Sequence, residues 1–352
     1  MFIKENVPLK DFTTMRVGGP ARFFVAIESL EELKNAIVFA RKKNLPIFIL
    51  GGGSNIIVSD EGFAGVVIKM EIRGIEIQNY ELRIKNKVLV TAGAGEDWDN
   101  FVGHTVSKNL YGIENLSYIP GTVGATPIQN VGAYGTEVSK TIKEVHVFDI
   151  ERMKEKVFSN KDCGFSYRDS IFKKKENNHL VVTHVTFLLK EDGNVNIEYK
   201  DVREYFGLGS ELRIKNYELE ITARDVREAV IAIRKRKLPD PHHIGTVGSY
   251  FKNPVLIKEQ ALKLKRQYPD MPMYPMENYG VKVPLAWILD HVCGLKGAQE
   301  GVVGLYENQP LALVHFGGGS TKGLLFFAEK VKCVVKEKTG IEIEEEVVMV
   351  SE

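Results

Sequence analysis

The chain has 352 residues, enough for two or three domains, and its 44% hydrophobic and 26% charged residues are typical of a globular protein. A net charge of +1 without a long basic block argues against nucleic acid as the main partner. The N-terminus lacks the apolar core of a signal peptide, and no run approaches the ~18 apolar residues of a membrane span. We therefore expect a cytoplasmic protein without membrane insertion.

The N-terminal stretch predicts a strand, a helix and a second strand. A turn at residues 18–20 leads into the first strand, and Ser29 opens the helix. Ser29 and Glu32 form a capping-box pair, and apolar side chains follow at helical spacing. Ile47–Leu50 then predicts a short buried strand, which completes one α/β unit.

The rest of the chain continues this mixed pattern. Thr222 caps a helix to about Lys237, and the prolines that follow indicate a domain boundary. The chain closes with a predicted strand over residues 341–350. Other predicted strands are 65–70, 88–94, 143–150 and 180–189, and other predicted helices are 96–108, 284–293 and 320–339.

The stretch from Tyr118 to Gly135, YIPGTVGATPIQNVGAYG, has many glycines and almost no charge. Glycine and proline exclude a regular helix, and the apolar composition is unlike that of a flexible linker. The stretch predicts an ordered loop whose bare backbone approaches a flat or anionic ligand. A set of tight turns between strands is the alternative.

A second glycine-rich segment, Gly51–Asn55, follows a predicted strand. Consecutive glycine amides form anion-binding nests, although neither the phosphate-loop nor the dinucleotide fingerprint is present. A tight turn between strands explains the same residues. Residues 317–319 resemble this segment but precede a capped helix, so there we predict a turn and a cap.

Several single residues are candidates for chemistry. Arg168 offers a planar, permanently charged group for a carboxylate or phosphate, with a surface arginine as the alternative. Ser249, between a glycine and two aromatic residues, is either a proton donor in a dry pocket or a turn residue. Glu344–Glu346 are either the frayed end of a strand or functional. The histidines form no metal-ligand set, and the cysteines Cys163, Cys293 and Cys333 predict reduced thiols rather than a metal site.

Seven motifs in order carry a resemblance to a known family. From about residue 8 to 350 the chain resembles the UDP-N-acetylenolpyruvoylglucosamine reductases, flavin enzymes that make UDP-N-acetylmuramate for bacterial cell walls. The motifs are RVGGPA at 16–21, LGGGSN at 50–55, IPGTVGATPIQNVGAYG at 119–135, YRDSIFK at 167–173, KLPDP at 237–241, GSYFKNP at 248–254 and the Glu-Val ending.

The resemblance implies an α+β fold with an FAD-binding domain of the vanillyl-alcohol-oxidase (PCMH) type. It implies two α/β subdomains over 1–68 and 69–220, a C-terminal α+β substrate-binding domain over 221–340, and a last strand over 341–352 that carries a catalytic glutamate. It also implies a monomer whose partners are NADPH and a UDP-sugar nucleotide.

The same resemblance assigns the two glycine-rich segments to FAD. We expect the FAD to be bound non-covalently, because GGGSNIIVSDEGF offers no histidine or cysteine for a tether. The positions implied to bind FAD are Gly51, Gly52, Gly53, Ser54, Asn55, Gly121, Gly124, Gln129, Asn130, Gly132 and Tyr134.

The resemblance further implies that Arg168, Ser249 and Glu346 are catalytic. Arg168 would stabilise charge on the substrate, Ser249 would protonate the carbon beside the carboxylate, and Glu346 would polarise or position. The family usually ends in Glu-Pro-Glu-Val, whereas Glu345 replaces the proline here, so a shift of one place would move the role to Glu345. The implied substrate-binding residues are Tyr199, in a segment typical of the family's longer subtype, Lys237 and Asn253.

Two other functions are compatible with the sequence. One is a flavin-dependent oxidase of the same fold that acts on another substrate. The other is a nucleotide-binding protein without turnover.

Overall fold

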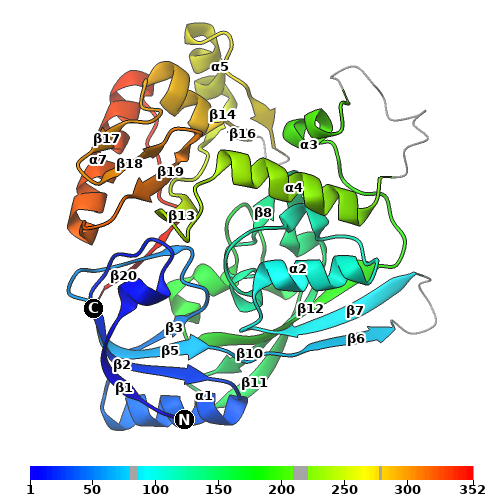
Figure 1. The fold of residues 1–352 in the computed structure, drawn as a ribbon, viewed down its shortest axis with the longest axis vertical. Coiled ribbons are helices and arrows are strands. Elements are labelled where there is room, and N and C mark those ends of the chain that lie inside the picture. The colour runs from blue at the N-terminus through cyan, green and yellow to red at the C-terminus, as the bar shows by residue number, and fades with distance from the viewer. Residues whose placement is uncertain (80–85, 209–220, 277–279, 352) are drawn as a thin grey trace. The chain divides into compact units, whose positions relative to one another are not determined.

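The computed structural model describes residues 1–79, 86–208, 221–276 and 280–351 and divides into two compact units (Figure 1). Each unit draws on separate stretches of the chain. Unit 1 comprises Met1–Asn6, Arg22–Gly52 and Ala64–Lys235. Unit 2 comprises Val7–Ala21, Gly53–Phe63 and Arg236–Glu352.

The first sheet of unit 1 has four strands in the order β1-β2-β5-β3, with α1 packed against it (Figure 1). The predicted cap is confirmed, because the Glu32 N–H donates to Ser29 Oγ at 3.2 Å. The Glu32 carboxylate in turn accepts from the Glu28 N–H at 2.8 Å. As predicted, α1 connects the strands β2 and β3, and β5 lies between these strands in the sheet and pairs with β3 in parallel. The bounds are β1 Lys4–Pro8, β2 Pro20–Ile27, α1 Leu30–Lys42, β3 Ile47–Leu50 and β5 Phe63–Met70.

The second sheet of unit 1 has five strands in the order β11-β10-β12-β7-β6. Its core holds Trp98 and Phe101 of α2 against Phe187 of β12, with ring centroids 5.0–5.9 Å apart. One continuous cluster of buried apolar side chains joins both sheets, α1 and α2. The bounds are β6 Ile75–Asn79, β7 Lys87–Gly93, α2 Trp98–Ser107, β10 Ile142–Asp149, β11 Lys154–Ser159 and β12 Leu180–Lys190.

Two further helices of the chain, α3 (Lys200–Tyr205) and α4 (Ala223–Lys237), share a smaller apolar cluster. The apolar face of α4 supplies Val226, Val230 and Ile233 to it. The predicted cap of α4 is confirmed, since the Asp225 N–H donates to Thr222 Oγ1 and the Thr222 N–H donates to the Asp225 carboxylate. The exposed residues Arg224 and Glu228 lie on the other side of α4.

Unit 2 contains a four-stranded antiparallel sheet in the order β13-β19-β18-β17 and a three-stranded one in the order β14-β16-β15. A parallel pair, β20 with β4, brings the C-terminus beside residues 56–58. The bounds are β4 Ile56–Val58, β13 Gly245–Ser249, β14 Val255–Ile257, α5 Lys258–Gln267, β15 Tyr274–Pro275, β16 Gly280–Lys282, α6 Leu285–Trp287, β17 Gln299–Glu300, β18 Val303–Tyr306, β19 Gln309–His315, α7 Thr321–Thr339 and β20 Val348–Val350.

Two predicted elements of unit 2 differ from the structure. The predicted closing strand over 341–350 is wrong in extent, because β20 begins only at Val348 and the preceding residues pair by an isolated bridge, Phe251 with Glu345. The predicted helix over 284–293 consists of the short α6 and a π-helical turn over Ile288–Val292. No helix within the described ranges has the length and apolarity to cross a membrane.

Candidate active site

In unit 1, the end of β3 packs against the start of the long glycine loop. A Cβ on Gly52 would lie 2.6 Å from the Gly121 Cα, so only glycine permits this approach. The carbonyl of Gly121 accepts from the Trp98 N–H at 3.1 Å, and the Gly124 N–H donates to the Ala94 carbonyl at 3.0 Å. Backbone contacts thus fix both glycine-rich segments of this unit.

Thr122 lies beside this contact with a buried hydroxyl. Its Oγ1 has no hydrogen-bond partner among the described residues, and a Cβ on Gly51 would come within 2.8 Å of it. A buried polar atom without a partner is costly, which indicates that a ligand completes its hydrogen bonding. Thr122 therefore marks a place for a polar ligand between residues 51 and 122.

Arg168 sits at the tip of a two-residue turn closed by Ser166 and Asp169. Its Nη2 donates to the Gly132 carbonyl at 2.7 Å, and its guanidinium lies 5.3 Å from the centre of the Tyr167 ring. The half-buried arginine is therefore oriented toward the glycine loop. The structure brings these predicted catalytic and FAD-binding residues together.

Two further hydrogen bonds hold the Arg168 turn to the glycine loop. Asn130 Nδ2 donates to the Ser166 carbonyl at 3.0 Å, and Ser170 Oγ donates to the Ile128 carbonyl at 2.6 Å. Gln129, between these anchors, is half-buried. The turn and the loop therefore form one hydrogen-bonded structure.

The far end of the glycine loop contacts the segment that carries Tyr199. The rings of Tyr134 and Tyr199 meet edge to face at 5.2 Å, and Asn196 Nδ2 donates to the Gly135 carbonyl at 3.1 Å. Asn115 Nδ2 donates to the carbonyls of both Tyr134 and Asn196. The predicted substrate-binding Tyr199 thus lies next to a predicted FAD-binding residue.

Several residues of this region adopt the left-handed backbone conformation. Their φ angles are +58° at Tyr118, +48° at Asn130, +48° at Tyr134 and +54° at Arg168. Asparagine tolerates this conformation, whereas tyrosine and arginine do so at a cost. Such strain concentrates at functional sites, where the surrounding structure enforces it.

In unit 2, Ser249 and Glu346 lie on neighbouring antiparallel segments. Ser249 ends β13 opposite Ala312 of β19, after a register shift that follows Thr246. The Glu346 N–H donates to the carbonyl of Tyr250, the residue after Ser249, at 2.7 Å. The structure thus places two of the three predicted catalytic residues on neighbouring segments.

The three glutamates of the C-terminal segment have different surroundings. Glu344 is exposed and pairs with Lys252 at 3.0 Å, and Glu345 pairs with Lys332 of α7 at 2.9 Å. Hydrogen bonds to Glu329 and Glu345 raise the pKa of Lys332. Glu346 alone of the three is buried.

The second half of the segment 51–55 lies in unit 2, beside the C-terminal residues. Asn55 Nδ2 donates to the Glu346 carbonyl at 3.3 Å, and the Val348 N–H donates to the Asn55 carbonyl at 3.0 Å. Gly53 has φ +65°, and a Cβ there would lie 2.0 Å from the Phe12 carbonyl oxygen. Ser54, between them, is half-buried.

The other two predicted substrate-binding residues lie in unit 2. Asn253 Oδ1 accepts from the Leu285 N–H at 2.9 Å, at the start of α6. Its oxygen is engaged in this way, so a hydrogen bond to an anionic ligand would come from Nδ2. Lys237 is the last residue of α4 and is half-buried.

Comparisons with known proteins identify the family. The chain is 39% identical over 348 residues to UDP-N-acetylenolpyruvoylglucosamine reductase of Flavobacterium johnsoniae, a match that covers 99% of each chain. It is 38% identical over 348 residues to the Ralstonia nicotianae protein of that name, again over 99% of each.

The chain belongs to the UDP-N-acetylenolpyruvoylglucosamine reductase family.

Family profiles and a solved structure agree with this membership. The profile of the FAD binding domain matches residues 21–151, and that of the C-terminal domain of UDP-N-acetylenolpyruvoylglucosamine reductase matches residues 240–350. The crystal structure of the reductase from Thermus caldophilus is similar, with a TM-score of 0.67 and 26% identity over 99% of this chain and 100% of that one. The predicted fold class is thereby confirmed.

The residues present fit the FAD that this reductase family implies. In unit 1, close glycine backbone and the buried Thr122 hydroxyl offer donors suited to a diphosphate. In unit 2, Thr13 and Thr14 also have buried Oγ1 atoms without a partner among the described residues, and the Thr14 N–H donates to the Gly53 carbonyl at 3.0 Å. Each of these three threonines thus lies beside a predicted FAD-binding glycine.

Sequence reasoning missed these three threonines. A single threonine carries no pattern, and the signal appears only when burial and hydrogen bonding are known. The reductase motifs RVGGPA and IPGTVGATPIQNVGAYG lie next to or include them, so they were the one available hint.

Proposed function

We propose that this chain reduces the enolpyruvyl group of UDP-N-acetylenolpyruvoylglucosamine to UDP-N-acetylmuramate for peptidoglycan synthesis, with bound FAD and with NADPH as the reductant. The observation that carries the proposal is the reductase-specific C-terminal match over residues 240–350, which includes Ser249, Asn253 and Glu346. A flavin oxidase of the same fold would share only the FAD-binding part.

Arg168 stabilises the charge that develops on the substrate. When bound, FAD supplies hydride to the enolpyruvyl carbon distal from the carboxylate, which leaves negative charge on the adjacent carbon and the carboxylate. A guanidinium is planar and permanently charged, so it suits that charge at any physiological pH. Its contact with the Gly132 carbonyl supports this role, because the group is oriented in advance.

Ser249 donates the proton to the carbon beside the carboxylate. The register shift in β13 and the left-handed Gly248, with φ +71°, support this role, since a local bulge re-aims the side chains that follow it. A hydroxyl is a weak acid, but a carbanion-like carbon is a strong base, so the transfer is feasible when the geometry is tight.

Glu346, rather than Glu345, is the functional glutamate. Glu346 is buried next to the Ser249 strand, whereas the Glu345 carboxylate is engaged by Lys332. A buried carboxylate near the substrate polarises or positions the groups around it. Although Glu345 replaces the family's usual proline, the functional role therefore stays with Glu346.

Tyr199, Lys237 and Asn253 bind the substrate. Tyr199 is 44% exposed and precedes the short α3, and a phenol hydroxyl can donate to a diphosphate. Lys237 and the Asn253 amide add a positive charge and a donor for the anionic substrate.

The test is product formation by the purified full-length protein. With the enolpyruvyl sugar nucleotide and NADPH, we expect one NADPH consumed per product and a product two hydrogens heavier by mass spectrometry. Hydrogen peroxide formed from an alcohol, with flavin retained on denaturation, would favour the oxidase. Absence of any turnover would favour the nucleotide-binding protein.

We further propose that the enzyme acts in the cytoplasm as a monomer. Its substrate and NADPH are soluble nucleotides, and the chain's near-neutral charge gives no reason to expect nucleic acid as a partner. As a step in cell-wall synthesis, the reaction would bear on cell shape, the cell cycle and division.

A further inference from the structure

Tyr118 opens the glycine loop in an unfavourable backbone conformation. Its φ of +58° lies in the left-handed region, which a tyrosine avoids because its Cβ crowds the backbone. Such a residue persists only where its surroundings hold it. What holds Tyr118 therefore controls how the chain enters the loop.

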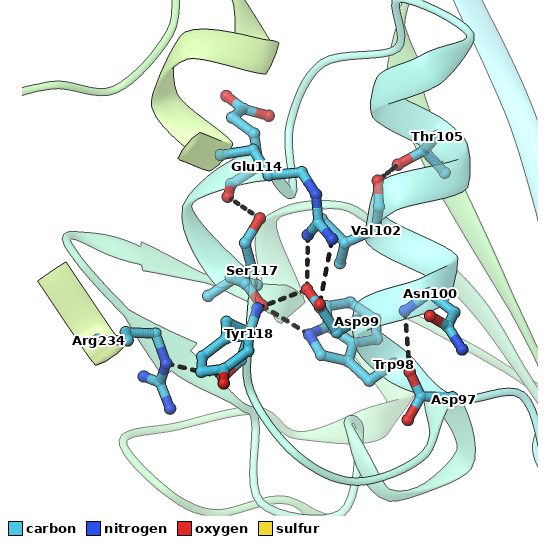
Figure 2. Close-up of polar contacts among 12 residues, drawn as sticks. Asp97, Trp98, Asp99, Asn100, Val102, Thr105, Glu114, Ser117, Tyr118 and Arg234 are labelled. Atoms are coloured by element: carbon cyan, nitrogen blue, oxygen red, sulfur yellow. Dashed lines mark hydrogen bonds and ion pairs between the residues drawn. The ribbon is translucent and has the colours of Figure 1, made fainter. Parts of the chain in front are cut away.

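Side chains hold both peptide groups of Tyr118. Its N–H donates to Asp99 Oδ1 of α2 at 2.5 Å, and its carbonyl accepts from Arg234 Nε of α4 at 2.8 Å (Figure 2). Lys235 Nζ lies 5.5 Å from the centre of the Tyr118 ring. The peptide groups before and after Tyr118 are thereby each held by a charged side chain.

Asp99 is itself held by the same helix. Arg227 Nη1 and Nη2 donate to its two carboxylate oxygens at 2.5 and 3.1 Å, in a bidentate pair. Arg227 and Arg234 are seven residues apart, about two helical turns, so they project from one face of α4. These two arginines lie beside the apolar face of α4 that packs with α3.

Arg234 reaches the other end of the loop as well. Burial lowers the pKa of its guanidinium, and the side chain of Tyr134 opposes that effect. Arg234 therefore interacts with both Tyr118 and Tyr134, the first and the next-to-last residue of the stretch 118–135.

We propose that Asp99, Arg227 and Arg234 form a Tyr118 clamp, a set of positioning residues that hold Tyr118 left-handed and so preset the glycine loop for the flavin. The inference rests on the proposed assignment of this loop to FAD. Hydrogen bonds to charged groups are stronger than neutral ones, so the clamp offsets the unfavourable conformation before any ligand arrives.

The test measures the dissociation constant of FAD from the flavin-stripped full chain. Asp99→Leu should raise it by about tenfold or more, because a hydrogen bond to a charged group is lost at the loop entry. In a Tyr118→Gly background the same change should raise it by less than about threefold, because glycine adopts the left-handed conformation unaided. Arg224→Ala, an exposed arginine on the same helix, is the control and should leave the constant unchanged.

An equal factor in both backgrounds, or no change in either, would overturn the clamp, since Asp99 would then serve only to dock the two helices. If Asp99→Leu does not fold, Arg227→Met, which removes the bidentate partner of Asp99, is measured in the same two backgrounds and should again raise the constant more with Tyr118 than with glycine at that position. Thr122→Val separates the two proposals, because it should weaken FAD binding without touching the clamp. An unchanged constant in Thr122→Val would contradict the flavin assignment of the loop itself.

Discussion

Backbone hydrogen bonds through Tyr250 hold the segments that carry Ser249 and Glu346. Tyr250 donates its N–H to the Leu311 carbonyl and accepts at its own carbonyl from the Glu346 N–H. These backbone bonds do not depend on the side chain at position 249 or 346, so we expect substitutions there to keep the strand pairing. Functional losses in such variants are then attributable to the deleted group.

Ser249→Ala should separate the two half-reactions. Flavin reduction by NADPH should proceed at the wild-type rate, while re-oxidation by the enolpyruvyl substrate should slow by about 10²–10⁴-fold, the usual contribution of a proton donor. Stopped-flow absorbance of the flavin measures both. Ser107→Ala, an exposed serine at the end of α2, is the control. Wild-type re-oxidation in Ser249→Ala would exclude Ser249 as the donor.

A pair of glutamine substitutions tests the glutamate assignment. Glu346→Gln should lower kcat by about 10²-fold or more, whereas Glu345→Gln should change kcat by less than about threefold. Loss of the half-exposed pair with Lys332 should cost Glu345→Gln only about 0–1 kcal/mol of unfolding free energy. Steady-state rates and urea unfolding of both variants provide the measurement, and the reverse order of rates would move the role to Glu345.

Among the secondary-structure elements, α1 depends on a local cap. Ser29→Ala removes the acceptor of the Glu32 N–H and should lower the free energy of unfolding by about 1 kcal/mol. Ser29→Asp keeps an acceptor at the same place and should restore most of the loss. Equal stability of Ser29→Ala and wild type in urea unfolding would show that the cap contributes nothing.

The buried carboxylate of Asp149, the last residue of β10, stabilises the hairpin formed by β10 and β11. Burial alone would raise its pKa, but hydrogen bonds from Lys156 Nζ at 2.7 Å and from the Arg152 N–H at 2.9 Å outweigh burial and lower the pKa to about 2. A lowered pKa means that the unfolded chain takes up the proton first as the pH falls. The stability that Asp149 contributes is therefore complete above about pH 4.

Asp149→Asn should consequently be less stable than wild type at neutral pH. The difference in unfolding free energy should shrink as the pH falls from about 4 toward 2, because Asp149 of the unfolded wild-type chain takes up a proton in that window while the folded carboxyl is still largely ionised. Urea unfolding across this pH range gives the difference, with the exposed Asp11→Asn as the control. A difference that stays constant down to pH 2 would contradict the assigned role.

At the scale of the whole molecule, local signals in the sequence predicted the elements well. Ser29 and Thr222 as caps and the helix that stops at Gly340 follow from contacts within a few residues, and the strand Ile47–Leu50 is visible as a short apolar run after a proline. The resemblance of ordered motifs supplied the fold class and the family. Both kinds of information are present in short stretches of chain.

Long-range placement could not be predicted in the same way. Residues 7–21 and 53–63 join the C-terminal part of the chain in unit 2, and β20 pairs with β4 across almost 300 residues of sequence. The hydrogen bonds from the Arg168 turn to the glycine loop and the orphaned hydroxyl of Thr122 likewise depend on residues distant in sequence. Periodicity and composition carry no information about such pairings.

The most direct measurement of the central claim is an anaerobic experiment on the wild-type protein with its flavin bound. NADPH should bleach the yellow flavin absorbance, and one equivalent of UDP-N-acetylenolpyruvoylglucosamine should then restore it while UDP-N-acetylmuramate appears in equal amount. Flavin that stays bleached after the substrate is added would contradict the proposed function.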